Sequence, residues 1–137
     1  KRAGLLQYAP FRLAVFEPGL PALILSWDGA GLTDRIEGQS GLLATSSSLV
    51  PVEAEESRRK LFDEALKGGM ADEATFDRLH RSHLPEKGAL SICMHREDAV
   101  TVSLTRIVAD QSIVRLGYVA GSPCEGAVEV TRVLRVA

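Results

Sequence analysis

The side chains best suited to metal binding or nucleophilic chemistry lie close together in this chain. All three histidines, His80, His83 and His95, and one of the two cysteines, Cys93, fall within the segment LHRSHLPEKGALSICMHR. An imidazole titrates near neutral pH, a thiolate attacks carbonyl groups, and both bind transition metals. The other cysteine, Cys124, lies in the turn-like string GSPCEG, and we expect this loop thiol to be incidental.

The spacing of these residues is compatible with two kinds of site. His80 and His83 are three apart on an expected helix, whereas Cys93 and His95 share one face of an expected strand. Together, HxxH and CxH supply the four ligands of a closed zinc site. Alternatively, Cys93 is a nucleophile paired with His95, although strand residues two apart have Cα atoms separated by about 7 Å. Outside the zinc alternative we expect no metal and no cofactor.

Two helices are predicted to precede and position this segment. Pro51 suits the first position of a helix, and Gly68-Gly69 ends that helix. Asp72 is expected to cap a second helix, which Pro85 ends. The run EAEESRRK in the first helix is interpreted as a solvated face with ion pairs four residues apart, for instance Glu55–Arg59 and Glu56–Lys60.

Short apolar runs predict the strands. FRLAVFE at 11–17 and PALILSW at 21–27 are split by Pro18-Gly19 and indicate a hairpin. Further strands are expected at 35–38, 42–46, 112–119 and 129–136. Because strands both precede and follow the two helices, we predict an α+β fold, with antiparallel sheets and helices packed on them.

A central hairpin over 88–108 is predicted to have two different faces, because its residue types alternate. The face expected in the core comprises Leu90, Ile92, Met94, Val100, Val102 and Leu104. The polar face carries the candidate residues for a substrate cleft, which we call the cleft residues: Ser91, Cys93, His95, Arg96, Thr101 and Ser103. Small neutral donors in place of Lys and Glu favour a face that lines a ligand cleft, with an ordinary solvated sheet face as the alternative.

Composition restricts the class of protein. The 137 residues predict one domain over 1–137, and 45% hydrophobic with 25% charged residues is the ordinary globular balance. With a net charge of −2 and no basic stripe, we expect no nucleic-acid partner. The apolar runs are shorter than the roughly 20 residues of a membrane span, and no signal peptide opens the chain. Two reduced thiols in the cytoplasm are the expected redox state.

Several strings resemble the NRDE protein family, which is named after an Asn-Arg-Asp-Glu tetrapeptide and is related to the transport-and-Golgi-organisation proteins. SICMHREDAVTVS carries most of the likeness, and GLLATSSS, SRRKLF, LHRSH and YVAGSPC add to it, so that the resemblance covers about residues 26–124. The likeness is to the C-terminal part of the family pattern. Family members begin with a Cys after the initiator Met, whereas this chain begins with Lys1 and contains no Asn.

This resemblance implies part of an N-terminal-nucleophile (Ntn) hydrolase-like αββα sandwich, in which two antiparallel sheets stack between layers of helices. It implies that the intact protein hydrolyses an amide or thioester bond with a leading Cys that lies outside this chain. The cleft residues would then face a small-molecule substrate, and the chain would associate with the missing N-terminal segment. The alternatives are a non-enzymatic binding or carrier domain for a small molecule, and a domain with a structural zinc site.

Overall fold

The computed structural model describes residues 4–37, 42–45, 47, 49–67 and 72–135. Within these residues the chain forms two antiparallel three-stranded sheets and two α-helices, which confirms the predicted α+β class. The chain divides into two compact units, residues 1–42 and residues 43–137. The single-domain organisation and the stacked Ntn-like sandwich stay predictions.

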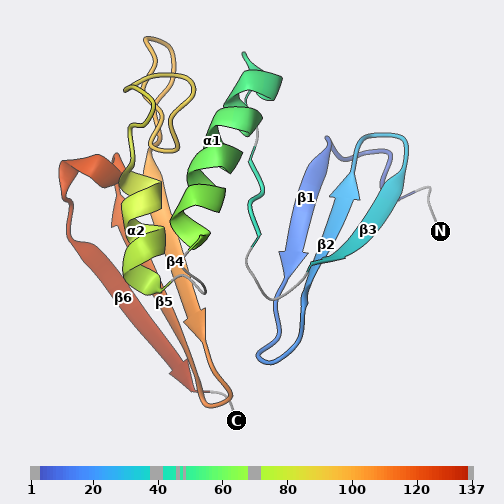
Figure 1. The fold of residues 1–137 in the computed structure, drawn as a ribbon. Coiled ribbons are helices and arrows are strands. Elements are labelled where there is room, and N and C mark those ends of the chain that lie inside the picture. Colours follow the sequence, from blue (N-terminus) through green and yellow to red (C-terminus); the bar gives the residue numbers. More distant parts are fainter. Residues whose placement is uncertain (1–3, 38–41, 46, 48, 68–71, 136–137) are drawn as a thin grey trace. The chain divides into compact units, whose positions relative to one another are not determined.

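The first unit is a three-stranded meander (Figure 1), and the predicted hairpin at its start is confirmed. Its strands are β1 (Phe11–Val15), β2 (Ala22–Trp27) and β3 (Leu32–Glu37). The turns need residues with positive φ, which Gly19 (85°) and Gly29 (98°) provide at low cost. Trp27 is buried, and its indole Nε1–H donates a hydrogen bond to the carbonyl of Tyr8 at 3.1 Å.

The second unit combines both helices with the other sheet (Figure 1). Its elements are α1 (Pro51–Leu66), α2 (Glu73–Arg81), β4 (Ser103–Ala109), β5 (Ile113–Ala120), the short 3-10 helix η1 (Pro123–Glu125) and β6 (Glu129–Arg135). The strands pair antiparallel in the order β4-β5-β6. Helix α2 lies over one face of this sheet, where Glu73 forms ion pairs with Arg106 at 3.4 Å and Arg115 at 3.1 Å.

Both helices begin where the sequence predicts. Pro51 is the first residue of α1, and the side chain of Asp72 caps α2 by accepting a hydrogen bond from the backbone N–H of Thr75 at 2.8 Å. The helices meet through Phe62 and Phe76, whose ring centroids are 6.4 Å apart. Among the described residues, the buried apolar side chains of this unit are Ala54, Phe62, Leu79, Cys93, Leu104, Val119 and Pro123.

The predicted strand at 88–95 is wrong. Among residues 82–102 the structure has no regular strand, only an isolated bridge between His95 and Val100. The predicted burial is also wrong for several residues, because Ser91 and Cys93 are fully buried while Val100 and Val102 are 44% and 68% exposed; Leu104 is buried as predicted. In this segment, the alternation of residue types therefore does not predict which side chains are buried.

Two smaller strand predictions differ from the structure. The predicted strand at 42–46 is wrong, because residues 42–45 form no strand; residue 46 lies outside the described residues. The strand expected at 35–38 begins earlier, at Leu32, and residue 38 lies outside the described residues. Helix α1 ends at Leu66, and the Gly68-Gly69 pair lies outside the described residues.

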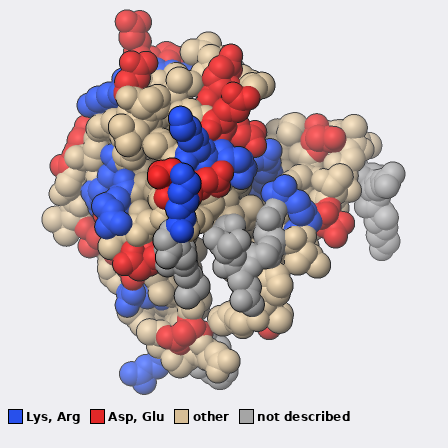
Figure 2. Space-filling model, in the orientation of Figure 1, with Lys and Arg blue, Asp and Glu red and all other residues tan. Residues whose placement is uncertain are grey.

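Charged side chains of both signs are interspersed over the visible face of the molecule (Figure 2). The predicted pair Glu55–Arg59 is present at 3.6 Å on α1, where it is exposed and contributes little. In the described part of the chain, no helix combines the length and the apolar character that crossing a bilayer requires.

Candidate metal centre

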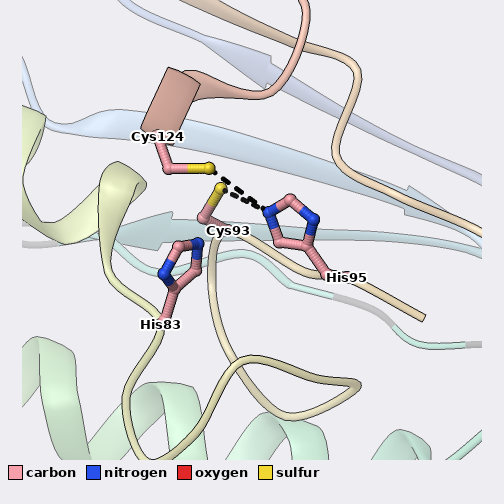
Figure 3. Close-up of side chains that lie close together, drawn as sticks. All are labelled: His83, Cys93, His95 and Cys124. Carbon is pink, nitrogen blue, oxygen red and sulfur yellow. Dashed lines mark hydrogen bonds between the residues drawn. The ribbon is translucent and has the colours of Figure 1, made fainter. Parts of the chain in front are cut away.

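Four side chains from separate parts of the second unit converge on one point (Figure 3). They are His83, Cys93, His95 and Cys124, and their potential ligand atoms all lie within 4.8 Å of one another. Nε2 of His95 lies 3.6 Å from Sγ of Cys93 and 3.3 Å from Sγ of Cys124. The rings of His83 and His95 meet edge to face, with centroids 5.1 Å apart. The cluster therefore offers two sulfur and two nitrogen donors.

The end of α2 positions two of these residues. His83 follows the last turn of the helix, which Ser82 closes by donating its N–H to the carbonyl of Leu79 at 3.1 Å. The carbonyl of Ser82 then accepts a hydrogen bond from the N–H of Cys93 at 3.0 Å. This bond pins the backbone of Cys93 against the end of the helix and brings its thiol next to His83.

The fourth side chain, Cys124, comes from the connection between β5 and β6. Cys124 lies in η1, directly after β5, and η1 is bounded by two glycines with positive φ, Gly121 at 81° and Gly126 at 72°. The guanidinium of Arg81 donates a hydrogen bond to the carbonyl of Pro123 and holds η1 near α2. The fold thus joins a helix end and a strand end at the centre.

A buried arginine on α1 holds the irregular segment that carries Cys93. The guanidinium of Arg58 donates to the carbonyls of Ala89 at 3.1 Å, Leu90 at 3.3 Å and Ser91 at 3.1 Å, and to the hydroxyl of Thr45 at 2.7 Å. Arg58 is 7% exposed, and this burial lowers the pKa of its guanidinium. The part of α1 that the sequence indicated to be solvated therefore includes a buried structural cation.

Two cleft residues with hydroxyl groups, Ser91 and Thr101, form hydrogen bonds with the backbone of the same segment. The hydroxyl of Ser91 is fully buried, with the carbonyls of Gly88 at 2.9 Å and Cys93 at 2.8 Å as acceptors. Oγ1 of Thr101 accepts a hydrogen bond from the N–H of Met94 at 2.9 Å. These bonds fix the backbone on either side of Cys93, as a rigid ligand site requires.

The remaining cleft residues lie further from the cluster. Arg96 is half-buried and forms a bidentate ion pair with Asp98 at 2.9 and 3.0 Å. Ser103 is half-buried and opens β4. That the cleft residues face a substrate stays a prediction.

His80 is not part of the cluster, although the zinc alternative from the sequence included it. Its Nδ1 lies 2.7 Å from the carbonyl of Phe76, and the residue is exposed. With Glu73, Asp77 and strand β4, it lines a cavity of about 430 Å³ under α2. Residues three apart on a helix share a face only inside the helix, and α2 ends at Arg81, before His83.

Burial changes the pKa of two of the four side chains, Cys93 and His95. Burial raises the pKa of the Cys93 thiol, so this sulfur is a poor nucleophile in the metal-free protein. Burial, followed by the charge of Lys87, lowers the pKa of His95 and so favours its neutral imidazole. Nε2 of His83 is buried and has no hydrogen-bond partner among the described residues. Such an atom needs a physical explanation, and coordination to an ion is one that fits the three neighbouring donors.

Two functional residues escaped the sequence analysis. Cys124 is far from the other three in sequence, and only the pairing of β5 with β4 brings η1 to the end of α2. The sequence did contain one hint of its role. Cys124 is the only cysteine outside the segment that holds Cys93 and all three histidines. Arg58 left no signal, because its neighbours Glu55, Glu56 and Arg59 are charged as well.

The chain was compared with protein families, curated proteins and solved structures. No family model, no curated protein and no solved structure matches the chain. The site is therefore interpreted from its geometry.

Proposed function

We propose that the second unit binds one zinc ion through Cys93, Cys124, His83 and His95, and that this ion stabilises the fold. The observation that carries the proposal is the convergence of four donor atoms within 4.8 Å of one another. Around a tetrahedral zinc with bonds of about 2.0–2.3 Å, neighbouring donors lie about 3.3–3.8 Å apart. The separations of 3.3 and 3.6 Å from His95 to the two sulfurs already fall in this range.

The types of the donors select the metal and its role. Two thiolates with two imidazoles in a tetrahedral arrangement favour zinc over magnesium or calcium, which prefer oxygen ligands. Four protein donors fill the coordination sphere, as in structural sites, whereas catalytic zinc keeps one position open for water. When bound, the metal would hold both sulfurs as thiolates. It would cross-link three parts of the unit: the end of α2 through His83, residues 93–95 through Cys93 and His95, and η1 through Cys124.

Reduced thiols are a condition of this function. Both cysteines are free, and a cytoplasmic location, which belongs to this proposal, would keep them reduced.

Zinc content and affinity test the proposal, with a matched control on the same helix. Elemental analysis should find one zinc per chain in the wild type and in His80→Gln, because His80 lies outside the cluster. Cys124→Ser and His83→Gln should weaken zinc binding by more than about 100-fold, since even changes to outer-shell partners cost about 10–100-fold. A wild-type protein that takes up no zinc, or a Cys124→Ser variant that binds it normally, overturns the proposal.

A second proposal rests on the string SICMHREDAVTVS, which contains two of the four ligands. On this proposal the chain is the C-terminal part of an NRDE-family protein, and the intact protein hydrolyses an amide or thioester bond with a leading cysteine. The test compares the chain alone with a version extended to that cysteine. Hydrolysis by the extended version only, lost in its Cys→Ala variant, supports the proposal, whereas equal turnover by that variant overturns it.

A further inference from the structure

The two thiols of the centre are the only two cysteines of the chain, and the fold places them together. Their sulfurs are within 4.8 Å of each other and share one neighbour, Nε2 of His95. A disulfide within the chain has this one pairing. Hence the atoms that would hold the metal are also the atoms that an oxidant would join.

The two sulfurs differ in their access to solvent. Cys93 is fully buried, whereas Cys124 is partly exposed on η1. A small oxidant therefore reaches Cys124 first, and Cys93 lies behind it as the thiol that resolves the oxidised sulfur. This pairing of an accessible thiol with a buried neighbour is the arrangement that reversible thiol oxidation requires.

Gly121 and Gly126 bound η1, and both have positive φ, a region that glycine adopts at little cost. Forming the S–S bond of about 2 Å would need a movement of Cys124 toward Cys93, for which these two glycines are the backbone positions with the most freedom. Cys93 needs no such movement, since its N–H stays bonded to Ser82.

We propose that the centre is a redox switch, in which a peroxide converts Cys93 and Cys124 to a disulfide and expels the metal. The inference rests on the proposed zinc site. The Cys124 thiolate attacks a peroxide oxygen, the O–O bond breaks, and a sulfenic acid and hydroxide form. The Cys93 thiolate then attacks the sulfenic sulfur, forming the S–S bond and releasing a second hydroxide. Two electrons pass from sulfur to peroxide, solvent protonates both hydroxides, and the metal leaves as a divalent ion.

The consequence is a loss of affinity that is tied to the chemistry. The disulfide removes both thiolate ligands and leaves two neutral imidazoles, which hold a divalent ion only weakly. Reduction restores both thiolates, so zinc should bind again. The protein would then exchange a metal cross-link for a covalent one as the thiol redox poise changes.

The test treats zinc-loaded protein with hydrogen peroxide and follows two quantities at once. A chromogenic chelator measures released zinc, and mass spectrometry of unreduced peptides measures the Cys93–Cys124 disulfide. We expect one zinc released per disulfide formed, equal rates for both, and full rebinding after a reductant and zinc are added. His80→Gln should behave as the wild type. Metal-free Cys93→Ser should stop at a sulfenic acid on Cys124, which a dimedone-type reagent traps.

Other outcomes separate this inference from the zinc site itself. Protein that binds zinc and keeps it while peroxide is consumed overturns the switch and leaves the zinc site standing. Zinc release with disulfides between chains, or with sulfinic acid in place of a disulfide, also overturns the switch. A wild type that never binds zinc overturns the proposed function, and a disulfide formed in that metal-free protein still confirms the pairing of the thiols.

Discussion

Arg58 organises the candidate centre without touching it. Its guanidinium supplies charged hydrogen bonds to three successive carbonyls of the segment that leads to Cys93. A backbone without regular secondary structure cannot satisfy those carbonyls itself, and buried carbonyls left without donors are costly. The position of Cys93 therefore depends on a side chain from another helix.

Replacing Arg58 tests this dependence. Arg58→Met keeps an unbranched apolar stem and removes the hydrogen-bond donors, so the free energy of unfolding should fall by about 2–4 kcal/mol. Zinc affinity should fall as well, because the backbone that carries Cys93 loses its support. Arg59→Met is the matched control: it removes an exposed ion pair and should change stability by less than about 0.5 kcal/mol. Urea denaturation measures both, and equal effects of the two variants would contradict the role of Arg58.

The zinc alternative from the sequence contains three of the four side chains that the structure brings together, His83, Cys93 and His95. Its fourth residue is His80, whereas the fourth side chain of the cluster is Cys124. Local spacing cannot show where a helix ends to within one residue, and that end decides whether two histidines share a face. Nor can it show which distant turn returns to the site, because this depends on strand pairing.

At the scale of elements, the irregular segment 82–102 shows why alternation of residue types failed as a guide. The alternation in GALSICMH predicts a strand with Leu90 inside. The structure buries Ser91 and Cys93 instead, since Arg58 and the end of α2 bind their backbone. Alternating residue types indicate only that a segment is suited to a strand. In this segment, hydrogen bonds to other parts of the fold determine the backbone conformation and which side chains are buried.

The cap of α2 gives a prediction for its stability at acid pH. Hydrogen bonds from Thr75 lower the pKa of Asp72 in the folded protein. Stability from a carboxylate with a lowered pKa is fully present above its unfolded value and is lost as pH falls through its folded value. Asp72→Ala should therefore destabilise metal-free protein most above about pH 5 and progressively less below about pH 4.

Asp72→Asn separates the charge from the cap. Asparagine also caps helices but does not titrate, so this variant should stay more stable than Asp72→Ala and lose the part of the acid dependence that Asp72 contributes. Denaturation of the three proteins in chelator, over pH 3–7, measures the difference. A gap between wild type and Asp72→Ala that stays constant with pH would contradict the assignment.

For the whole molecule, the sequence predicted the α+β class, the first hairpin and both helix starts, since these depend on local signals such as Pro51 and Asp72. It did not predict the division into two compact units. All four proposed ligands lie in the second unit. The proposed metal therefore acts on one unit, with the first sheet as an internal reference.

Hydrogen exchange tests this confinement. Zinc at 100 times its dissociation constant should slow exchange by up to about 100-fold at amides whose exchange requires release of the metal. We expect this protection at 82–95 and 121–126, with unchanged exchange in β2. Mass spectrometry of peptides measures it, and zinc that slows β2 as much as 82–95 would contradict a site confined to the second unit.

X-ray absorption at the zinc K-edge of the zinc-loaded protein counts the ligand atoms directly and so tests the central claim. Coordination by Cys93, Cys124, His83 and His95 predicts two sulfurs at about 2.3 Å and two nitrogens at about 2.0–2.1 Å. One sulfur with three nitrogens, which a site containing His80 in place of Cys124 would give, contradicts the account.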